Sequence, residues 1–197
     1  MATAQPETDT GNRILDIAER LAQTRGFNAF SYADIAAALG VTKASLHYHF
    51  PSKAKLGERL VERYQAAFVD RLAHIERSHA DPRARLAAYV GVYREVLENG
   101  RMCLCGMLAA DQETLPEPMR ARVREFFDLN EAWLAALLQQ GRKSGRILFS
   151  GPPAARARLL IGALEGAMLL ARSHQDPGRF HAAAKCLMAD LGAGGRR

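Results

Sequence analysis

A dense run of hydrogen-bonding side chains lies at residues 42–53. It carries hydroxyl, ammonium, imidazole and phenol groups, on Thr42, Lys43, Ser45, His47, Tyr48, His49 and Lys53. Such groups donate hydrogen bonds to phosphate oxygens, and lysine also bonds the O6 and N7 atoms of guanine. Leu46 and Phe50 lie four residues apart, so a helix here would bury one face and leave these donors on the other. The run predicts a recognition helix for the DNA major groove.

Within this run, two residues on the first turn are predicted to contact bases. Lys43 can bond guanine, and the methyl group of Ala44 can touch the methyl group of thymine. The surrounding donors are predicted to contact phosphates, and these are Thr42, Ser45, His47, Tyr48, His49 and Lys53. An ordinary solvated helix face is the competing interpretation, and the order of the whole motif favours DNA contact over it.

A second unusual run, residues 102–108, combines methionines and leucines with two thiols, Cys103 and Cys105. Such soft side chains adapt to a ligand, so the run predicts one wall of a small-molecule pocket. Residues two apart on a helix point about 200° apart, so the two thiols should not share a cavity, and no C-x-C metal site is expected. Buried structural cysteines are the competing interpretation. If a thiol does sense an effector, Cys103 is expected to be that thiol, rather than Cys186.

A carboxylate stands inside the apolar run 159–171, at Glu165. A carboxylate in such a place needs a partner or a polar ligand. The predicted effector site is mostly apolar with a few polar groups, as small-ligand sites usually are, and consists of Met102, Cys103, Met107, Phe126, Phe127, Asn130, Trp133, Glu165 and Met168. For the aromatic members, ordinary core packing is the competing interpretation.

The elements that must position these residues are predicted to be helices throughout. Apolar residues recur at helical spacing between short Gly, Pro and Asp breaks, and alternating β-branched runs are absent. Ser31 with Asp34 forms a helix-start signal, and Gly40 a helix-stop signal. The pattern predicts an all-α fold of nine helices, at about 14–25, 31–40, 42–50, 52–79, 81–99, 102–110, 117–141, 154–171 and 177–191.

The length of 197 residues favours a small head joined to a larger body. We expect a disordered arm at 1–11, a helix-turn-helix DNA-binding domain at 12–56, a ligand-binding and dimerisation domain at 57–192 and a flexible tail at 193–197. In the body, small residues predict a close helix interface across a two-fold dimer, formed by Gly162, Ala163, Gly166 and Ala167 with Phe180, Leu187 and Met188. Internal packing is the alternative explanation for those small residues.

Charge, hydropathy and cysteine content narrow the class of protein. The net charge is +6. Residues 12–80 carry ten basic and seven acidic side chains, and residues 81–197 carry seventeen and twelve, so the positive charge is spread over the chain. Charge alone therefore does not locate a nucleic-acid surface. No secretory signal or membrane-spanning stretch is expected, and the odd number of three cysteines favours reduced thiols. A cytoplasmic protein is predicted.

The DNA-binding motif resembles the head of TetR-family repressors. The resemblance rests on Gly26, Phe27, Ser31, Asp34 to Ala36, Gly40 to Lys53 and Leu56. It implies a ligand-binding body, a homodimer and an inducer pocket, and it implies that Tyr48 also reaches a base. Two departures stand out: His47 replaces the tyrosine that the family most often has, and Lys55 replaces a frequent glutamate. His47 is either a pH-sensitive phosphate contact or a solvated bystander.

The predicted function is a DNA-binding transcriptional regulator, a repressor that binds an inverted-repeat operator as a homodimer. A small-molecule effector, with thiol-reactive compounds among the candidates, would release it; activation instead of repression stays open. No cofactor is expected. An enzyme is disfavoured because the sequence offers no nucleophile with its base, no metal-ligand set and no phosphate loop. A helical carrier would leave the motif at residues 42–53 without a purpose.

Overall fold

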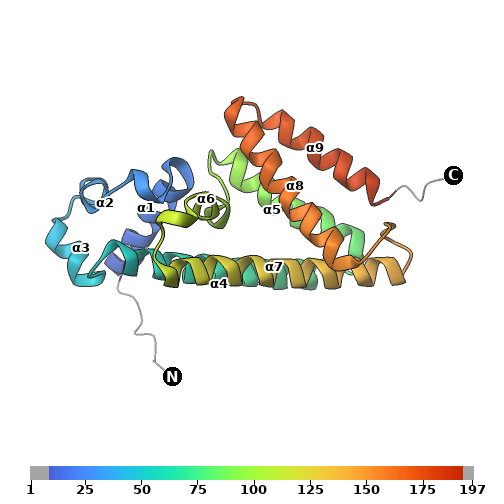
Figure 1. Ribbon diagram of the computed structural model, residues 1–197, viewed down its shortest axis with the longest axis horizontal. Coiled ribbons are helices and arrows are strands. Elements are labelled where there is room, and N and C mark those ends of the chain that lie inside the picture. The colour runs from blue at the N-terminus through green and yellow to red at the C-terminus, as the bar shows by residue number, and fades with distance from the viewer. Residues whose placement is uncertain (1–8, 193–197) are drawn as a thin grey trace, which may run out of the picture. The chain divides into compact units, whose positions relative to one another are not determined.

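The computed structural model describes residues 9–192, and within that range the protein is all-helical, without strands (Figure 1). Nine α-helices and two short 3-10 turns follow each other along the chain. They are α1 (Asp9–Arg25), η1 (Phe27–Ala29), α2 (Tyr32–Leu39), α3 (Lys43–His49), α4 (Lys53–Ser78), α5 (Pro82–Glu98), α6 (Leu104–Ala110), η2 (Gln112–Thr114), α7 (Glu117–Lys143), α8 (Pro153–Ser173) and α9 (Pro177–Asp190). The predicted all-α class and the count of nine helices are confirmed for this part of the chain.

The short helices of the head begin and end where the sequence predicts. Ser31 and Asp34 form a complete capping box at the start of α2, which satisfies backbone N–H groups that lack helical partners. Gly40 ends α2 with a φ of 68°, a left-handed conformation that glycine adopts without strain. The Thr42 hydroxyl then caps α3, and the Ser52 hydroxyl accepts from the Lys55 N–H at 3.2 Å at the start of α4. Local side-chain chemistry therefore fixes the tight turn between α2 and α3.

Two of the differences between predicted and observed boundaries bear on the predicted domains and site. Residues 9–11, expected in the disordered arm, form the first turn of α1, where Gly11 is buried. The rest of that arm and the tail at 193–197 lie outside the described residues. Cys103, expected inside a helix, immediately precedes α6, which begins at Leu104. Because Cys103 lies outside α6, helical geometry does not set the angle between the two thiols.

One compact unit contains the head. Its described part runs to Gln65 and includes Leu104–Val123, so that α6 packs against α1. The core of this unit is apolar and fully buried, with Ile14, Leu15, Ile35, Leu46 and Leu56 among its members. At Gly57, an added Cβ would lie 2.4 Å from Met119 Sδ, so a larger residue there would require the Met119 side chain to move. The expected division of the chain at residues 56 and 57 stays a prediction.

The second compact unit comprises Ala66–Cys103 and the chain from Arg124 onward. Helices α5, α8 and α9 contact one another pairwise in it, and Figure 1 shows α8 and α9 lying side by side. Its core includes the fully buried Tyr89, Phe126, Leu164, Met168 and Phe180. None of the helices that the structure describes is both long enough and apolar enough to cross a membrane.

Candidate nucleic-acid interface and buried polar cluster

Helix α3 has one buried face and one open face. Leu46 is fully buried, and Phe50, which ends the helix, is buried beside it. Lys43, Ala44 and Tyr48 lie on the open side, and the Tyr48 side chain is 85% exposed, the largest value among the large hydrophobic side chains of the described chain. A phenol with so much apolar surface in water is well suited to contact another molecule.

The remaining predicted DNA-binding residues of α3 support that face. The Thr42 hydroxyl oxygen accepts from the Ser45 backbone N–H at 3.3 Å, which leaves its own proton available to an outside acceptor. The His49 ring packs edge-on against Tyr48, with ring centroids 5.3 Å apart. This contact restricts the otherwise free Tyr48 ring.

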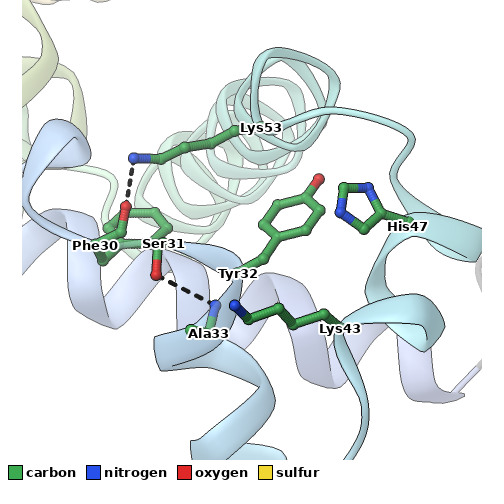
Figure 2. Close-up of a pocket in the computed structure, with 7 residues that line it drawn as sticks. All are labelled: Phe30, Ser31, Tyr32, Ala33, Lys43, His47 and Lys53. Carbon is green, nitrogen blue, oxygen red and sulfur yellow. Dashed lines mark hydrogen bonds between the residues drawn. The ribbon is translucent and has the colours of Figure 1, made fainter.

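A surface depression of about 400 Å³ adjoins α3. It is lined by Phe30, Ser31, Tyr32, Ala33, Lys43, His47 and Lys53 (Figure 2). Tyr32 is a buried member of this lining: its hydroxyl donates to the Phe50 carbonyl at 2.8 Å, and burial raises the pKa of Tyr32 to about 12. The start of α2 and two lysines border the same hollow, so it is chemically suited to an anion.

His47 lies against the Tyr32 ring, with centroids 4.7 Å apart, as Figure 2 shows. Its Nδ1 is 3.3 Å from the carbonyl oxygen of Pro51. A carbonyl only accepts hydrogen bonds, so Nδ1 must carry the proton in this contact. The neutral ring then presents an acceptor at Nε2, and only the protonated ring presents a donor there.

Lys53 points into the head rather than away from it. Its Nζ donates to the Phe30 carbonyl at 2.5 Å and lies 4.8 Å and 4.5 Å from the ring centroids of Phe27 and Phe30. Burial lowers the pKa of Lys53, while the carboxylates of Asp34 and Asp111 act in the opposite direction. The sequence predicts a phosphate contact for this residue, and the structure engages its ammonium group within the head.

In the second unit, three buried side chains form a closed ring of hydrogen bonds. The Tyr89 hydroxyl donates to Asn130 Oδ1 at 2.8 Å, and Asn130 Nδ2 donates to the Tyr93 hydroxyl at 3.0 Å. The two hydroxyl oxygens are 3.1 Å apart. Because the Tyr89 proton is used on Asn130, Tyr93 must donate to Tyr89, which completes the ring. Burial raises the pKa of both tyrosines.

Glu165 interacts with this ring. Its charge adds to the effect of burial and raises the pKa of both tyrosines. Burial raises the pKa of Glu165 itself to about 6, and a hydrogen bond from the Cys103 thiol acts in the opposite direction. The buried Oε1 atom of Glu165 has no hydrogen-bond partner in the structure. A carboxylate in this condition is costly unless a ligand or a proton satisfies it.

The structure brings together only part of the predicted effector site. Cys103, Asn130 and Glu165 belong to the polar cluster, and Trp133 stacks on Tyr89 at 5.5 Å while its Nε1 donates to Glu76. The other members pack as follows: Phe126 against Phe68 and Phe127, Met102 and Met168 in buried positions, and Met107 in the unit that contains the head. Sequence reasoning missed Tyr89 and Tyr93, although two tyrosines four residues apart on a buried helix face are a usable signal.

Helix α8 carries an exposed apolar stripe. Leu159, Leu169 and Leu170 are 57%, 56% and 60% exposed, with Gly162 and Gly166 between them. A Cβ atom added at either glycine would meet nothing within 4 Å. By contrast, Phe180, predicted at the same interface, is fully buried in its own unit. Among the described residues, no group of three or more His, Cys, Asp and Glu side chains is placed to hold a metal ion.

Comparison with known proteins agrees with this geometry. The family described as "Bacterial regulatory proteins, tetR family" matches residues 14–60, and the "Tetracyclin repressor-like, C-terminal domain" matches residues 82–187. The transcriptional repressor NemR of Escherichia coli K12 is 30% identical over 173 residues, which cover 84% of this chain and 85% of NemR.

Two solved structures extend the likeness to three dimensions. A TetR-family regulator from Agrobacterium tumefaciens superposes with a TM-score of 0.90 at 34% identity, covering 93% of this chain and 97% of the other. The reduced form of E. coli NemR superposes with a TM-score of 0.81 at 27% identity, covering 94% and 98%. NemR and the Agrobacterium tumefaciens protein are both described as regulators of transcription, in agreement with the expectation that the chain is not an enzyme.

Proposed function

This chain belongs to the TetR family of bacterial regulatory proteins, and we propose that it is a repressor that binds an inverted-repeat operator as a homodimer. The observation on which the proposal rests is the open face of α3, where Lys43, Ala44 and Tyr48 are exposed to solvent. Lys43 and Ala44 would read bases, and Tyr48 would reach a base or a phosphate. Repression, rather than activation, is supported by the likeness to the repressor NemR.

Around that face, the phosphate contacts are assigned to Thr42, Ser45, His47 and His49. The Thr42 hydroxyl proton and the protonated His47 ring are available as donors at the rim of the helix. Lys53 would contribute indirectly, because its ammonium group holds the start of α4 against Phe27 and Phe30. A positioning role thus replaces a direct phosphate contact for this one lysine.

The homodimer would form through the exposed stripe on α8. Three leucines in water flank two glycines whose Cβ positions are open, so a second copy could approach its helix backbone closely. A two-fold contact of this kind uses the same patch on both copies. Two recognition helices would then read two half-sites, since one short helix contacts too few bases for specific binding.

Release of DNA would follow from an effector bound at the cluster of Tyr89, Tyr93, Cys103, Asn130 and Glu165. A buried carboxylate oxygen without a partner supports a ligand site, and the thiol beside it supports thiol-reactive compounds as effectors. An effector releases DNA only if it stabilises one conformation more than another. Helices α4 and α7 each contribute residues to both compact units, and such a change would pass through elements of this kind.

A gel-shift experiment with the DNA that flanks the protein's own gene tests this function. Specific retention that Lys43→Ala and Tyr48→Ala weaken, and that Lys185→Ala on α9 leaves unchanged, is the expected result. A small molecule that abolishes retention would support repression with an inducer. No retention even at low salt would favour a helical carrier and contradict the proposal.

A further inference from the structure

We propose that Glu165 is the proton acceptor that makes the Cys103 thiol reactive toward soft carbon electrophiles, such as α,β-unsaturated carbonyl compounds. The proposal rests on the thiol-responsive effector site of the proposed function and assigns its chemistry. The residues that carry it lie in one compact unit, Cys103 just before α6 and Glu165 in the middle of α8.

The first observation is the pairing of a thiol with a carboxylate in a buried place. Cys103 is buried, and its thiol donates a hydrogen bond to Glu165. The thiolate is the nucleophilic form of cysteine, so the thiol must lose its proton during reaction. The Glu165 carboxylate already holds that proton by a hydrogen bond and needs no movement to accept it.

The second observation explains why the carboxylate remains available as a base. The protons of Tyr89, Tyr93 and one N–H of Asn130 are consumed within their own closed ring. The Oε1 atom of Glu165 consequently has no partner, although two phenols lie nearby. Were those hydroxyls turned to Glu165, they would stabilise its charge and weaken it as a base.

The chemical step balances without an oxidant or a reductant. The S–H bond of Cys103 breaks, its proton passes to the Glu165 carboxylate, and the sulfur forms a bond to the β-carbon of the unsaturated carbonyl compound. The C=C electron pair shifts to give an enolate. The proton on Glu165 then returns to the α-carbon, so that the net reaction is addition of the thiol and Glu165 ends as a carboxylate.

The titratable side chains that interact with the pair include two tyrosines. Tyr89 and Tyr93 from α5 face it, and burial keeps both phenols protonated far above neutral pH. Asn130 from α7 does not titrate. The pH profile of labelling therefore reports on the Glu165 carboxyl group and not on these two phenols.

The experiment measures labelling of the intact protein by N-ethylmaleimide, an α,β-unsaturated carbonyl compound. Rates at Cys103 are followed by mass spectrometry with fragmentation, which separates Cys103 from Cys105, between pH 5 and 9. In the parent, the rate should rise up to about pH 6–7 and then flatten, because the base is fully ionised there. In Glu165→Gln, the rate at pH 7 should fall at least about tenfold and keep rising toward the ordinary thiol range near pH 8.5.

Two further variants make the outcome decisive. Glu165→Asp keeps a carboxylate and should restore the flattened profile, whereas Glu131→Gln removes an exposed carboxylate paired with Arg158 and should leave the rates unchanged. If Cys103 is labelled equally fast or faster in Glu165→Gln than in the parent, the proposed role of Glu165 is wrong, while the thiol-responsive effector site is not contradicted. If Cys103 in the parent resists labelling at every pH, the thiol-responsive effector site fails together with it, while DNA binding by α3 stays unaffected.

Discussion

Lys43 and Lys53 belong to the same motif, yet their ammonium groups have different surroundings. Lys43 is exposed at the start of α3, while Lys53 rests on the carbonyl of Phe30 and two aromatic rings. Sequence spacing places both lysines near the recognition helix but does not determine which way a long side chain turns. That choice depends on where Phe27 and Phe30 end up in the folded head, which is a property of tertiary packing.

The two lysines should therefore give different phenotypes when replaced by alanine. Lys43→Ala should lower operator affinity by about 1–3 kcal/mol and relax base preference. Lys53→Ala should lower the free energy of unfolding by about 1 kcal/mol, through lost cation–π and carbonyl contacts. Binding titrations over a range of salt concentrations, with urea unfolding of both variants, separate the two effects. A reduced salt slope in Lys53→Ala with unchanged stability would show that Lys53 reaches phosphate after all.

Operator binding should strengthen as the pH falls through the range where histidine becomes protonated. With Nδ1 held by the Pro51 carbonyl, the neutral His47 ring offers phosphate an acceptor, and the protonated ring offers it a donor. Anisotropy titrations at pH 5.5–8 measure the slope, which His47→Gln should reduce. His74→Gln, at an exposed histidine on α4, is the control. Identical slopes for the parent and His47→Gln would leave His47 a bystander.

Glu165→Gln should stabilise the protein at neutral pH. The pKa of Glu165 is about 6 in the folded state against 4.5 ordinarily, so the native state favours the protonated group. Stability from this group is complete below about pH 4.5 and is lost as the pH rises through about 6, by roughly 2 kcal/mol. Glutamine mimics the protonated form and can still accept from Cys103. Urea unfolding at pH 4 and pH 7.5 should show a gain only at pH 7.5; no gain there would contradict the assigned burial.

At the scale of helices, the sequence predicted the boundaries that local chemistry decides. These boundaries depend on residues close together in the sequence. They are the capping box of Ser31 and Asp34, the positive φ of Gly40 and the cap at Thr42. The ring of Tyr89, Tyr93 and Asn130 was not predicted, because it joins residues of α5 and α7 that only packing brings together. The start of α6 after Cys103 was not predicted either, since Met102 and Cys103 fit an apolar helix as well as the residues that follow.

Gly166 on α8 allows a direct test of the proposed helix interface. Gly166→Leu should leave the protomer folded, since its Cβ position is open and leucine favours helix over glycine by about 0.8 kcal/mol. In a dimer, the added side chain should weaken association by about 1–3 kcal/mol for each of the two copies. Sedimentation equilibrium measures the change. Gly91→Leu on α5, where an added Cβ meets only Arg94 at 3.9 Å, is the matched control. An unaltered dimer in Gly166→Leu would move the interface elsewhere.

For the whole molecule, amino-acid composition does not locate the DNA-binding surface, whereas the arrangement of exposed and buried side chains does. The net charge of +6 is spread along the chain, so it does not mark the DNA-binding surface. What distinguishes that surface is a short helix with one buried face, a polar open face and a very exposed tyrosine. The second unit carries the polar cluster and the exposed stripe on α8, so the proposed sensing and dimerisation both reside there.

The central claim is that two copies of α3 read an inverted repeat, and selection from fragmented genomic DNA followed by sequencing tests it most directly. The parent protein should enrich fragments that share an inverted repeat with half-sites about one helical turn, or a multiple of it, apart. Lys43→Ala, selected in parallel, should lose that enrichment or relax the shared sequence. Enrichment of a single unrepeated site, or identical enrichment by the parent and Lys43→Ala, would contradict the account.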